Sequence, residues 1–325
     1  MKHFCEKLLA MIAVVAIIIM CSCSDKGKLS NDEVENKRMN SVYYWRTVFS
    51  LDTTEKAFLV KHKIDRIYLK MFDVAIEYNH AIGKPEVVPI ATMQFKSEIP
   101  TNVEVVPVAY ITLDALRAMS GRESEFASLL VERLKAMMSY NECGAMREIQ
   151  LDCDWTKSTK KIYSMLCSSV KKMLEKEGVK LSVTIRLHQL KEVPPEADSG
   201  VLMLYNTGAL KDTTTKNSIL DIEDVEPYLE KTDYPLALDY AYPTFGWGVK
   251  FKENEFVAIV SDQDTIASKG EQLRIERPSC KEIILVKKLV EKKLGKPEVG
   301  NILYHLDSKQ LKNYTEDEIN QIFAY

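Results

Sequence analysis

The chain lacks the short motifs that mark several common classes of protein. No Gly-x-Gly-x-x-Gly turn is present, which argues against a dinucleotide-binding sheet. There is no Gly-x-Ser-x-Gly and no convincing Ser-His-Asp spacing, so a serine hydrolase is not indicated. Cys-x-x-Cys pairs and Cys/His spacings are also missing, and neither a zinc site nor another bound metal is expected.

Charge of one sign is not concentrated anywhere in the sequence. The chain has 44 basic and 47 acidic residues, a formal net charge of -3, and no basic stripe with interleaved aromatic residues. Nucleic acid is therefore not an expected partner, and nothing in the sequence calls for a cofactor. Beyond the N-terminus, no apolar run is long enough to span a membrane.

The first forty residues resemble an export signal followed by a tether. A basic start precedes thirteen apolar residues, 8–20, which suit the core of a signal peptide. The run ends in Cys21-Ser22-Cys23, where a small residue before a cysteine resembles a bacterial lipobox. We predict a lipoprotein signal peptide at 1–22, lipidation of Cys23 with Cys21 as the alternative, and a flexible tether at 23–40. The protein is then expected in a bacterial cell envelope, lipid-anchored on the periplasmic face or the cell surface. An ordinary signal peptide is the alternative.

Residues 41–325 alternate short apolar stretches with amphipathic ones. Strands are predicted at 42–46, 66–72, 103–110, 148–155, 180–188, 201–206, 236–242 and 301–306. Helices are predicted at 53–63, 123–140, 158–177, 222–231, 279–294 and 315–323. Eight strands with intervening helices predict a single-domain (β/α)8 TIM barrel, with a doubly wound open sheet as the alternative. Extra hairpins are expected at 86–95 and between 245 and 277.

The fourth predicted strand has the most informative pattern. Because side chains alternate along a strand, Gln150, Asp152 and Asp154 share one face. Burying charge is costly unless it is paired, so this face must line something polar. Asp152 and Asp154 are candidate catalytic carboxylates, one carrying a proton and the other a charge. The alternative is that they are structural and pair with Arg186 or Lys70 inside the barrel.

The other predicted strand ends carry groups that suit a sugar. All three tryptophans lie at or just after a strand end, and flat rings stack on the C–H faces of sugars. Carboxylate pairs are also the machinery of glycoside hydrolysis. The predicted substrate-binding residues are Trp45, Arg46, Trp155, Arg186, Tyr205, Asn206, Tyr242, Trp247 and Tyr304. The alternative for each tryptophan is packing between barrel and helices.

Two short motifs resemble the family-eighteen glycoside hydrolases, the chitinases and endo-N-acetylglucosaminidases. Their Asp-x-Asp-Trp-Glu signature is matched by Asp152-Cys153-Asp154-Trp155, and their Met-x-Tyr-Asn by Met203-Leu204-Tyr205-Asn206. The stretch from Tyr242 to Trp247 loosely resembles their seventh-strand region. Thr156 stands where that family has its catalytic glutamate. The resemblance implies either that the acid comes from elsewhere, from Asp154 or Asp239, or that the barrel only binds glycans.

A longer stretch resembles an uncharacterised family of exported bacterial barrels, a domain of unknown function. The matching residues are Gln150-Leu151-Asp152-Cys153-Asp154, Tyr163 and Leu181-Ser182-Val183-Thr184. This resemblance implies a fold and an export route but no reaction.

These patterns predict an exported lipoprotein whose glycoside-hydrolase-like barrel acts on or binds a glycan at its C-terminal strand face. The alternative is a catalytically inactive barrel that serves as a glycan- or protein-binding module. A third hypothesis, a metal-dependent hydrolase using Asp152, Asp154 and His188, is weaker because these residues lack a recognisable ligand spacing. Cys153 and Cys167 are expected to be buried free thiols, with a disulfide as the alternative.

Overall fold

The computed structural model describes residues 38–230, 234–264, 266–267 and 269–324. From Arg38 onward the chain forms one compact unit. The predicted signal peptide, Cys23 and the predicted tether up to residue 37 lie outside the described residues.

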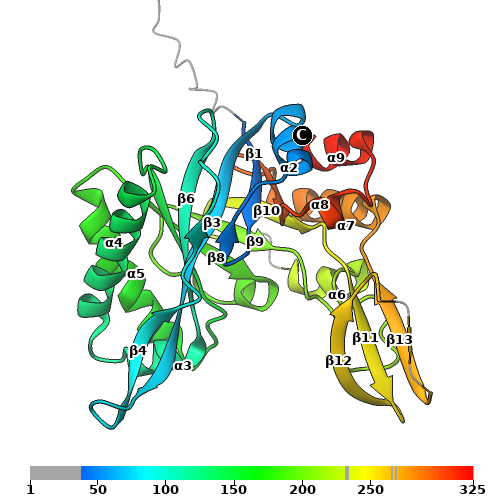
Figure 1. The fold of residues 1–325 in the computed structure, drawn as a ribbon, viewed down its shortest axis with the longest axis horizontal. Helices are drawn as coiled ribbons and strands as arrows, with labels where there is room; N and C mark the ends of the chain where they lie inside the picture. The colour runs from blue at the N-terminus through cyan, green and yellow to red at the C-terminus, as the bar shows by residue number, and fades with distance from the viewer. Residues whose placement is uncertain (1–37, 231–233, 265, 268, 325) are drawn as a thin grey trace, which may run out of the picture. The chain divides into compact units, whose positions relative to one another are not determined.

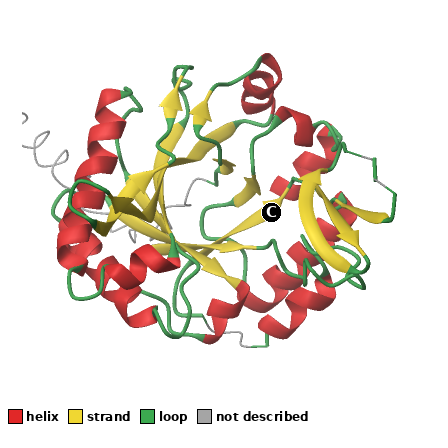
Figure 2. Cartoon of the chain, turned by 60° about the horizontal axis from the view of Figure 1, so that its bottom comes forward, coloured by secondary structure: helices red, strands yellow, loops and turns green. Residues whose placement is uncertain are grey.

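Eight parallel strands close into a barrel, with helices around it (Figure 2). Going round the barrel, the strands are β1 (Asn40–Tyr44), β3 (Ile64–Asn79), β6 (Glu104–Ile111), β7 (Glu148–Asp152), β8 (Lys180–Arg186), β9 (Ser199–Met203), β10 (Leu238–Pro243) and β14 (Asn301–Tyr304). Ser41 of β1 lies opposite Ile302 of β14 and opposite Arg66 of β3, so the sheet has no open edge at this point. The (β/α)8 prediction is confirmed, and the doubly wound sheet is excluded because the sheet closes.

Helices follow most of the strands, and the predicted helices are present except that the one predicted at 222–231 is a short α-helix, 222–225, followed by a 3-10 helix, 226–228. They are α2 (Thr53–Lys61), α3 (Leu113–Ala118), α4 (Glu123–Tyr140), α5 (Lys160–Glu175), α6 (Ile222–Val225), α7 (Cys280–Leu294), α8 (Ser308–Leu311) and α9 (Glu316–Phe323). Two short 3-10 helices, η1 (Leu187–Lys191) and η2 (Glu226–Tyr228), lie in the loops after β8 and β9.

Local sequence signals explain where the longer helices begin and end. Ser279 caps α7, and its side chain accepts from the amide of Glu282 in a capping box. Gly178 after α5 and Gly295 after α7 have φ values of 68° and 91°, the left-handed conformation that glycine adopts at least cost. The cap of α2 is Asp52, whose side chain accepts from the amide of Glu55 at 2.8 Å.

Two hydrophobic cores lie on opposite sides of the barrel wall. The inner core fills the barrel and contains Tyr43, Tyr68, Val106, Val108, Val201, Met203, Ala241, Ile302 and Tyr304. The outer core lies between strands and helices and takes the alternate residues of the same strands, such as Val42 and Tyr44 of β1. Polar side chains that point inward therefore replace part of the inner core.

Two additions extend from the carboxyl ends of barrel strands (Figure 1). β3 runs on past the barrel and pairs antiparallel with β4 (Lys84–Ile90), and a short parallel pair joins β2 (Val48–Phe49) to β5 (Gln94–Phe95). After β10, a three-stranded antiparallel sheet forms from β11 (Trp247–Lys252), β12 (Glu255–Ser261) and β13 (Glu271–Glu276). The hairpin expected at 86–95 is formed instead by the end of β3 and β4, so its turn precedes residue 86, whereas the hairpin expected between 245 and 277 is confirmed, with β13 as an additional strand.

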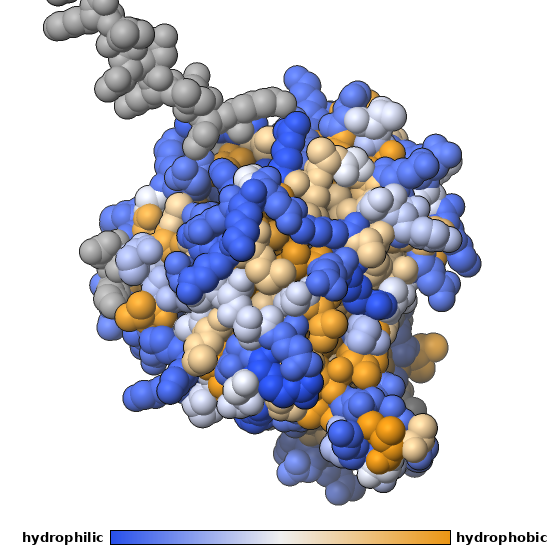
Figure 3. All heavy atoms as spheres, turned by 90° about the vertical axis from the view of Figure 1, so that its left-hand side faces the viewer, coloured by the Kyte–Doolittle hydropathy of each residue, from blue (hydrophilic) through white to orange (hydrophobic). Residues whose placement is uncertain are grey.

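The surface over α4 and β4 is mainly hydrophilic, with apolar side chains scattered among polar ones (Figure 3). Leu129 and Tyr140 of α4 and Met165 of α5 are the large exposed apolar residues of these two helices. Among the described residues, no helix combines the length and the apolar character needed to cross a membrane.

Candidate functional site

The carboxyl ends of β7, β8 and β9 bring together a cation, two carboxylates and a phenol. Asp152 is the last residue of β7 and is buried, whereas the side chain of Asp154, two residues on, is 46% exposed. Arg186 ends β8, and Tyr205 follows β9. Residues at this end of a parallel barrel form the usual site for chemistry.

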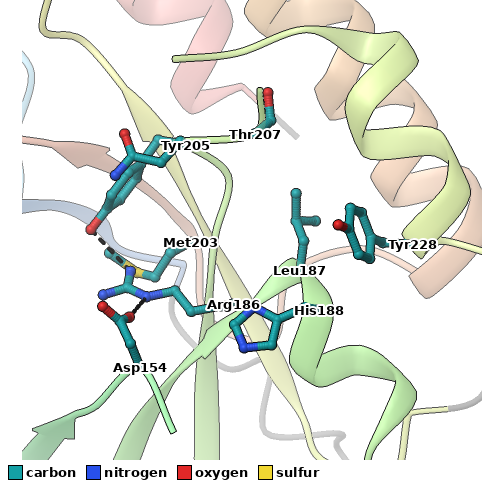
Figure 4. A pocket seen from close by; sticks show the side chains of 9 residues that line it. Asp154, Arg186, Leu187, His188, Met203, Tyr205, Thr207 and Tyr228 are labelled. Atoms are coloured by element: carbon teal, nitrogen blue, oxygen red, sulfur yellow. Dashed lines mark hydrogen bonds and ion pairs between the residues drawn. The ribbon is translucent and has the colours of Figure 1, made fainter. Parts of the chain in front are cut away.

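Arg186 contacts all three of these groups (Figure 4). Its Nε donates to Asp154 Oδ1, its Nη2 donates to Asp152 Oδ1 at 3.1 Å, and its Nη1 donates to the Tyr205 hydroxyl at 3.0 Å. The guanidinium carbon also lies 5.4 Å from the centre of the Tyr205 ring. The planar guanidinium therefore holds the two carboxylates and the phenol in one fixed arrangement.

Burial and charge act against each other at this cluster. Burial raises the pKa of Asp152, while the charge of Arg186 and the hydroxyl of Thr184, which donates to Asp152, oppose the rise. Burial by itself would lower the pKa of Arg186, but the neighbouring Tyr205, Asp152 and Asp154 outweigh it and the pKa is raised. Arg186 therefore stays a cation at any physiological pH.

An aromatic wall stands beside the cluster. We give this name to Trp45, Tyr205, Phe245, Trp247 and Tyr304. Tyr205 and Tyr304 are stacked with ring centres 4.5 Å apart, Trp45 lies 5.7 Å from Tyr304, and Phe245 links Tyr304 at 5.9 Å to Trp247 at 5.3 Å. Every ring of the wall except that of the buried Tyr304 is partly exposed. Such a surface offers flat faces to a ring-shaped ligand.

A cavity of about 220 Å³ opens between the cluster and the loops after β8 and β9. It is lined by Asp154, Arg186, Leu187, His188, Met203, Tyr205, Asn206, Thr207 and Tyr228. Figure 4 shows Tyr228 and Leu187 on one side of this space and the Asp154–Arg186 pair on the other. The volume is below the range of about 300–1,000 Å³ that drug-sized ligands occupy, so the cavity itself suits one small ring.

Trp155 does not belong to the site, contrary to our prediction. Its side chain is 1% exposed, lies in the outer core and stacks on Tyr163 of α5 with ring centres 6.3 Å apart. The ring therefore packs between barrel and helix and presents no face to a ligand. The matching motif at this position contributes its two aspartates to the site and not its tryptophan.

Asp239 lies at the other end of the barrel, so its predicted catalytic role is also corrected. It is the second residue of β10, and its carboxylate accepts from the amides of Val299 at 2.7 Å and Gly300 at 2.9 Å. Burial raises its pKa to about 6, against the lowering effect of these two amides. The charged groups that influence it there are Glu148 and Arg66, which form an ion pair at 3.1 Å.

Two predicted binding residues have structural contacts instead. Arg46 is paired with Glu55 in α2 and donates to the carbonyl oxygen of Leu306 at 2.8 Å. Tyr242 is fully buried in the outer core. The remaining predicted residues, Trp45, Arg186, Tyr205, Asn206, Trp247 and Tyr304, lie in the aromatic wall or line the cavity.

Several residues at the site were not in the predicted set. Thr184 lies two residues before Arg186 on the same strand face, so alternation could have identified it. Phe245 comes two residues after β10 ends, and Tyr228 belongs to a 3-10 helix within the predicted helix at 222–231, where the sequence did not indicate that its side chain faces the site. Lys70 also lies close to the wall, with its Nζ 5.5 Å from the Trp45 ring centre, and pairs with Asp73 at 2.9 Å.

Thr156 is held by the turn that leads into α5. Its amide donates to Thr159 Oγ1 at 2.9 Å, and its own hydroxyl lies 2.9 Å from Ser158 Oγ. Within the described part of the chain, no group of three or more His, Cys, Asp or Glu side chains could hold a metal ion.

Solved structures with a similar architecture include chitinases and a spore cortex-lytic enzyme. A chitinase from Chromobacterium violaceum aligns with a TM-score of 0.56 at 14% identity, over 88% of this chain and 98% of its own. The spore cortex-lytic enzyme SleL of Bacillus cereus aligns with a TM-score of 0.56 at 14% identity, over 89% and 75%. The GH18 chitinase ChiB of Flavobacterium johnsoniae aligns with a TM-score of 0.56 at 13% identity, over 88% and 93%. No family model matches the sequence, and no curated protein matches it either. These likenesses establish the fold.

Proposed function

We propose that this protein is an exported, lipid-anchored barrel that binds a glycan at its C-terminal mouth without hydrolysing it. The observation that carries the proposal is the contact of Arg186 with both Asp152 and Asp154, beside an aromatic wall and with a threonine at position 156. The site keeps the features that bind a sugar, and both of its aspartates are held by Arg186.

Hydrolysis of a glycosidic bond needs a carboxylic acid that gives a proton to the leaving oxygen. Asp152 is buried beneath Arg186 and bonded to Thr184, and Asp154 is committed to Arg186 from the other side. The hydroxyl of Thr156 cannot serve as the acid at neutral pH, because an aliphatic hydroxyl holds its proton too tightly. Neither the pair nor the residue after Trp155 therefore offers the required acid.

Binding of a sugar needs flat apolar faces together with hydrogen-bonding groups. The aromatic wall supplies the faces, and Asp154, His188, Asn206 and Thr207 along the cavity supply donors and acceptors. A structurally similar chitinase from Ostrinia furnacalis, with a TM-score of 0.55 at 12% identity, is in complex with penta-N-acetylchitooctaose, (NAG)5. Oligosaccharides of N-acetylglucosamine are therefore the first ligands to test.

The N-terminal pattern supports the export and the anchor. Thirteen apolar residues followed by Cys21-Ser22-Cys23 match a lipoprotein signal, which would place the mature protein in a bacterial envelope with Cys23 lipidated. A membrane anchor would hold the barrel where envelope or environmental glycans reach its mouth.

The proposal is tested by titrating the protein calorimetrically with (NAG)5 and by assaying the same mixtures for released sugar. Because Trp45 presents a partly exposed ring in the wall, Trp45→Ala should weaken binding about tenfold or more. Tyr140→Ala, at an 89% exposed position on α4, is the matched control and should bind as the wild type does. If (NAG)5 does not bind, a glycan array identifies another class, and retention of none would overturn the proposal.

A glycoside hydrolase that uses Asp154 is the second candidate, because this carboxylate remains 46% exposed at the mouth. Release of sugar that disappears in Asp154→Asn, with ligand affinity retained, would establish it in place of the binding function. The binding function instead predicts no release by the wild type and none by Arg186→Met, in which the carboxylates lose their cation.

A further inference from the structure

A groove with an apolar floor and a rim of lysines lies on the side of the barrel opposite the mouth. It lies between α2 and residues 96–103, which precede β6, and has a volume of about 770 Å³. Its lining residues are Leu51, Lys56, Leu59, Val60, Lys63, Ile64, Asp65, Lys96, Ser97, Glu98, Ile99, Pro100, Thr101, Asn102 and Val103. This volume is more than three times that of the cavity at the mouth.

The floor of the groove is apolar and its edge exposes a valine. Leu51, Leu59 and Ile64 are buried below it, and Ile99 is partly buried. Val60, on the outer side of α2, is 81% exposed. Among the described residues, no other large aliphatic side chain has a larger exposed fraction. An apolar side chain in this position loses contact with water only when something covers the groove.

Cationic side chains surround this apolar floor. Lys56, Lys63 and Lys96 are exposed, and none of their ammonium groups forms an ion pair with another residue in the described ranges. The acidic side chains along the same groove are Glu98, which is exposed, and Asp65, which is partly buried. The rim therefore carries more positive than negative charge, in a chain whose overall charge is -3.

The groove lies at the end of the barrel where the described chain begins. Asn40 at the start of β1 is paired with Ile64 of the groove, and its Nδ2 donates to the carbonyl oxygen of His62 at 2.8 Å. In Figure 1 the start of β1 and the loop before β6 lie together at the top, while β4 and β11–β13 lie at the bottom. Residues 24–37 span at most roughly 50 Å even when fully extended, so an anchor at Cys23 would hold this end of the barrel within that distance of the membrane.

We propose that the groove docks on the anionic phospholipid surface of the membrane that holds the anchor. The lysines would face the lipid phosphates, and Val60 with the apolar floor would meet the outer part of the acyl chains. The proposal rests on the proposed lipid anchor for its geometry. It sets the orientation of the molecule, with the groove against the membrane and the glycan-binding mouth facing away.

The test places a fluorescent reporter at the groove of the full-length protein purified from bacterial envelopes. Val60→Trp is reconstituted into vesicles of acyl-brominated phosphatidylglycerol or acyl-brominated phosphatidylcholine, since bromine quenches tryptophan only at close range. Val257→Trp, on β12 at the opposite end and 49% exposed, is the matched control. Quenching of Val60→Trp, stronger in phosphatidylglycerol, with no change in the control is the expected result. Equal quenching of both variants, or none at Val60→Trp, overturns the proposal.

The contribution of the lysine charges to membrane docking is measured by introducing Lys56→Gln and Lys96→Gln into the Val60→Trp chain. Each lysine removed should shift the ratio of docked to undocked molecules about fivefold, read from the quenched fraction. Lys63 is left unchanged because its φ of 48° makes the position sensitive to substitution. An unchanged quenched fraction would contradict a role for the lysines and overturn docking on anionic lipid.

The same sample distinguishes a protein whose Cys23 carries no lipid from a protein whose groove does not dock on the membrane. Mass spectrometry of the N-terminal peptide shows whether Cys23 carries a lipid. Quenching at Val60→Trp in a chain without the lipid supports docking by the groove and contradicts the proposed lipid anchor. Absence of quenching in a lipid-carrying chain contradicts docking by the groove and is consistent with the proposed lipid anchor.

Discussion

Asp239 is placed where its charge destabilises the fold. The side chain is 4% exposed at the N-terminal end of β10, and burial raises its pKa to about 6 from a usual value near 3.8. Between these two values the folded protein keeps a proton that the unfolded chain releases. The folded state therefore binds more protons, and this residue makes the free energy of unfolding fall as the pH rises from about 4 to about 6.

We therefore expect Asp239→Asn to be more stable than the wild type above pH 6 and equally stable near pH 4. The asparagine oxygen can still accept from Val299 and Gly300, while the ionisation that costs about 3 kcal/mol is removed. Urea unfolding of both chains at several pH values measures the difference. Asp114→Asn, at a side chain that is 78% exposed, is the control and should show no such dependence. A wild type and an Asp239→Asn chain that differ equally at pH 4 and pH 7 would contradict this account.

His305 contributes to the pH dependence of the free energy of unfolding with the opposite sign. The contribution of Asp239 is therefore obtained only from the difference between the variant and the wild type. Burial lowers the pKa of His305 to about 4. Its contribution to stability is present above the unfolded value of about 6.5 and is lost as the pH falls through 4. The two slopes oppose each other across the same range.

The side of the barrel wall on which each side chain near the site lies could be predicted where the alternation of side chains along a strand was applied consistently. Alternation placed Asp152 and Asp154 inside the barrel, and both lie there with Arg186, one of the two predicted structural partners. The same alternation places Trp155 outside with Cys153, and the structure confirms that side for both residues. Asp239 lies in the middle of its predicted strand, 236–242, and only the observed start of β10 at Leu238 places it near the N-terminal end. The correction for Trp155 could therefore have been made from the sequence, whereas that for Asp239 needed the structure.

At the scale of elements, Glu276 joins the β11–β13 sheet to the loop that covers it. This buried carboxylate accepts from the amide of Ser218 at 2.8 Å and from Trp247 Nε1 at 2.9 Å through one oxygen, and from Arg274 Nε at 2.6 Å through the other. Arg274 in turn donates to the carbonyl oxygens of Leu210 and Asp212. The sheet, the loop and one residue of the aromatic wall depend on this single side chain.

Glu276→Gln should therefore loosen these elements by about 3 kcal/mol, because the substitution removes the buried charge that pairs with the partly buried Arg274. We expect faster hydrogen exchange in residues 208–218 and 247–276, with the amides of the barrel strands unchanged. Exchange is followed by mass spectrometry of peptic peptides. Glu255→Gln, exposed at the start of β12, should exchange as the wild type does. Equal loosening of the barrel and the sheet would show that Glu276 supports the whole fold.

The barrel strands were predictable because each is a short apolar run flanked by helical periodicity. The extent of β3 was not, because the strand continues beyond residue 72 through pairing with β6 as far as Val74 and with β4 as far as Asn79, contacts made by the tertiary structure. β13 was missed for a similar reason. Its sequence Glu-Gln-Leu-Arg-Ile-Glu is mostly polar, and it forms a strand because β11 lies beside it.

At the scale of the whole molecule, closure of the barrel ties distant segments into one structure. The four cysteines beyond the N-terminus are Cys143 after α4, Cys153 after β7, Cys167 in α5 and Cys280 at the start of α7, and all are buried free thiols. Burial raises the pKa of each thiol, to about 11 for Cys143. Since the thiolate is the reactive form, both access and ionisation protect these side chains in the folded state.

Because β1 pairs with β14 as well as β3, no strand of the barrel can separate without breaking contacts on both sides. We therefore expect all four thiols to become reactive together, at one urea concentration that coincides with the loss of tertiary structure. Labelling with iodoacetamide followed by mass spectrometry resolves each cysteine separately. A cysteine introduced by Tyr140→Cys, at an 89% exposed position, should react at once without urea and confirms that the reagent is active. Labelling of Cys280 at a lower urea concentration than Cys153 would mean that α7 detaches first, and the closed barrel would then not unfold as a single cooperative unit.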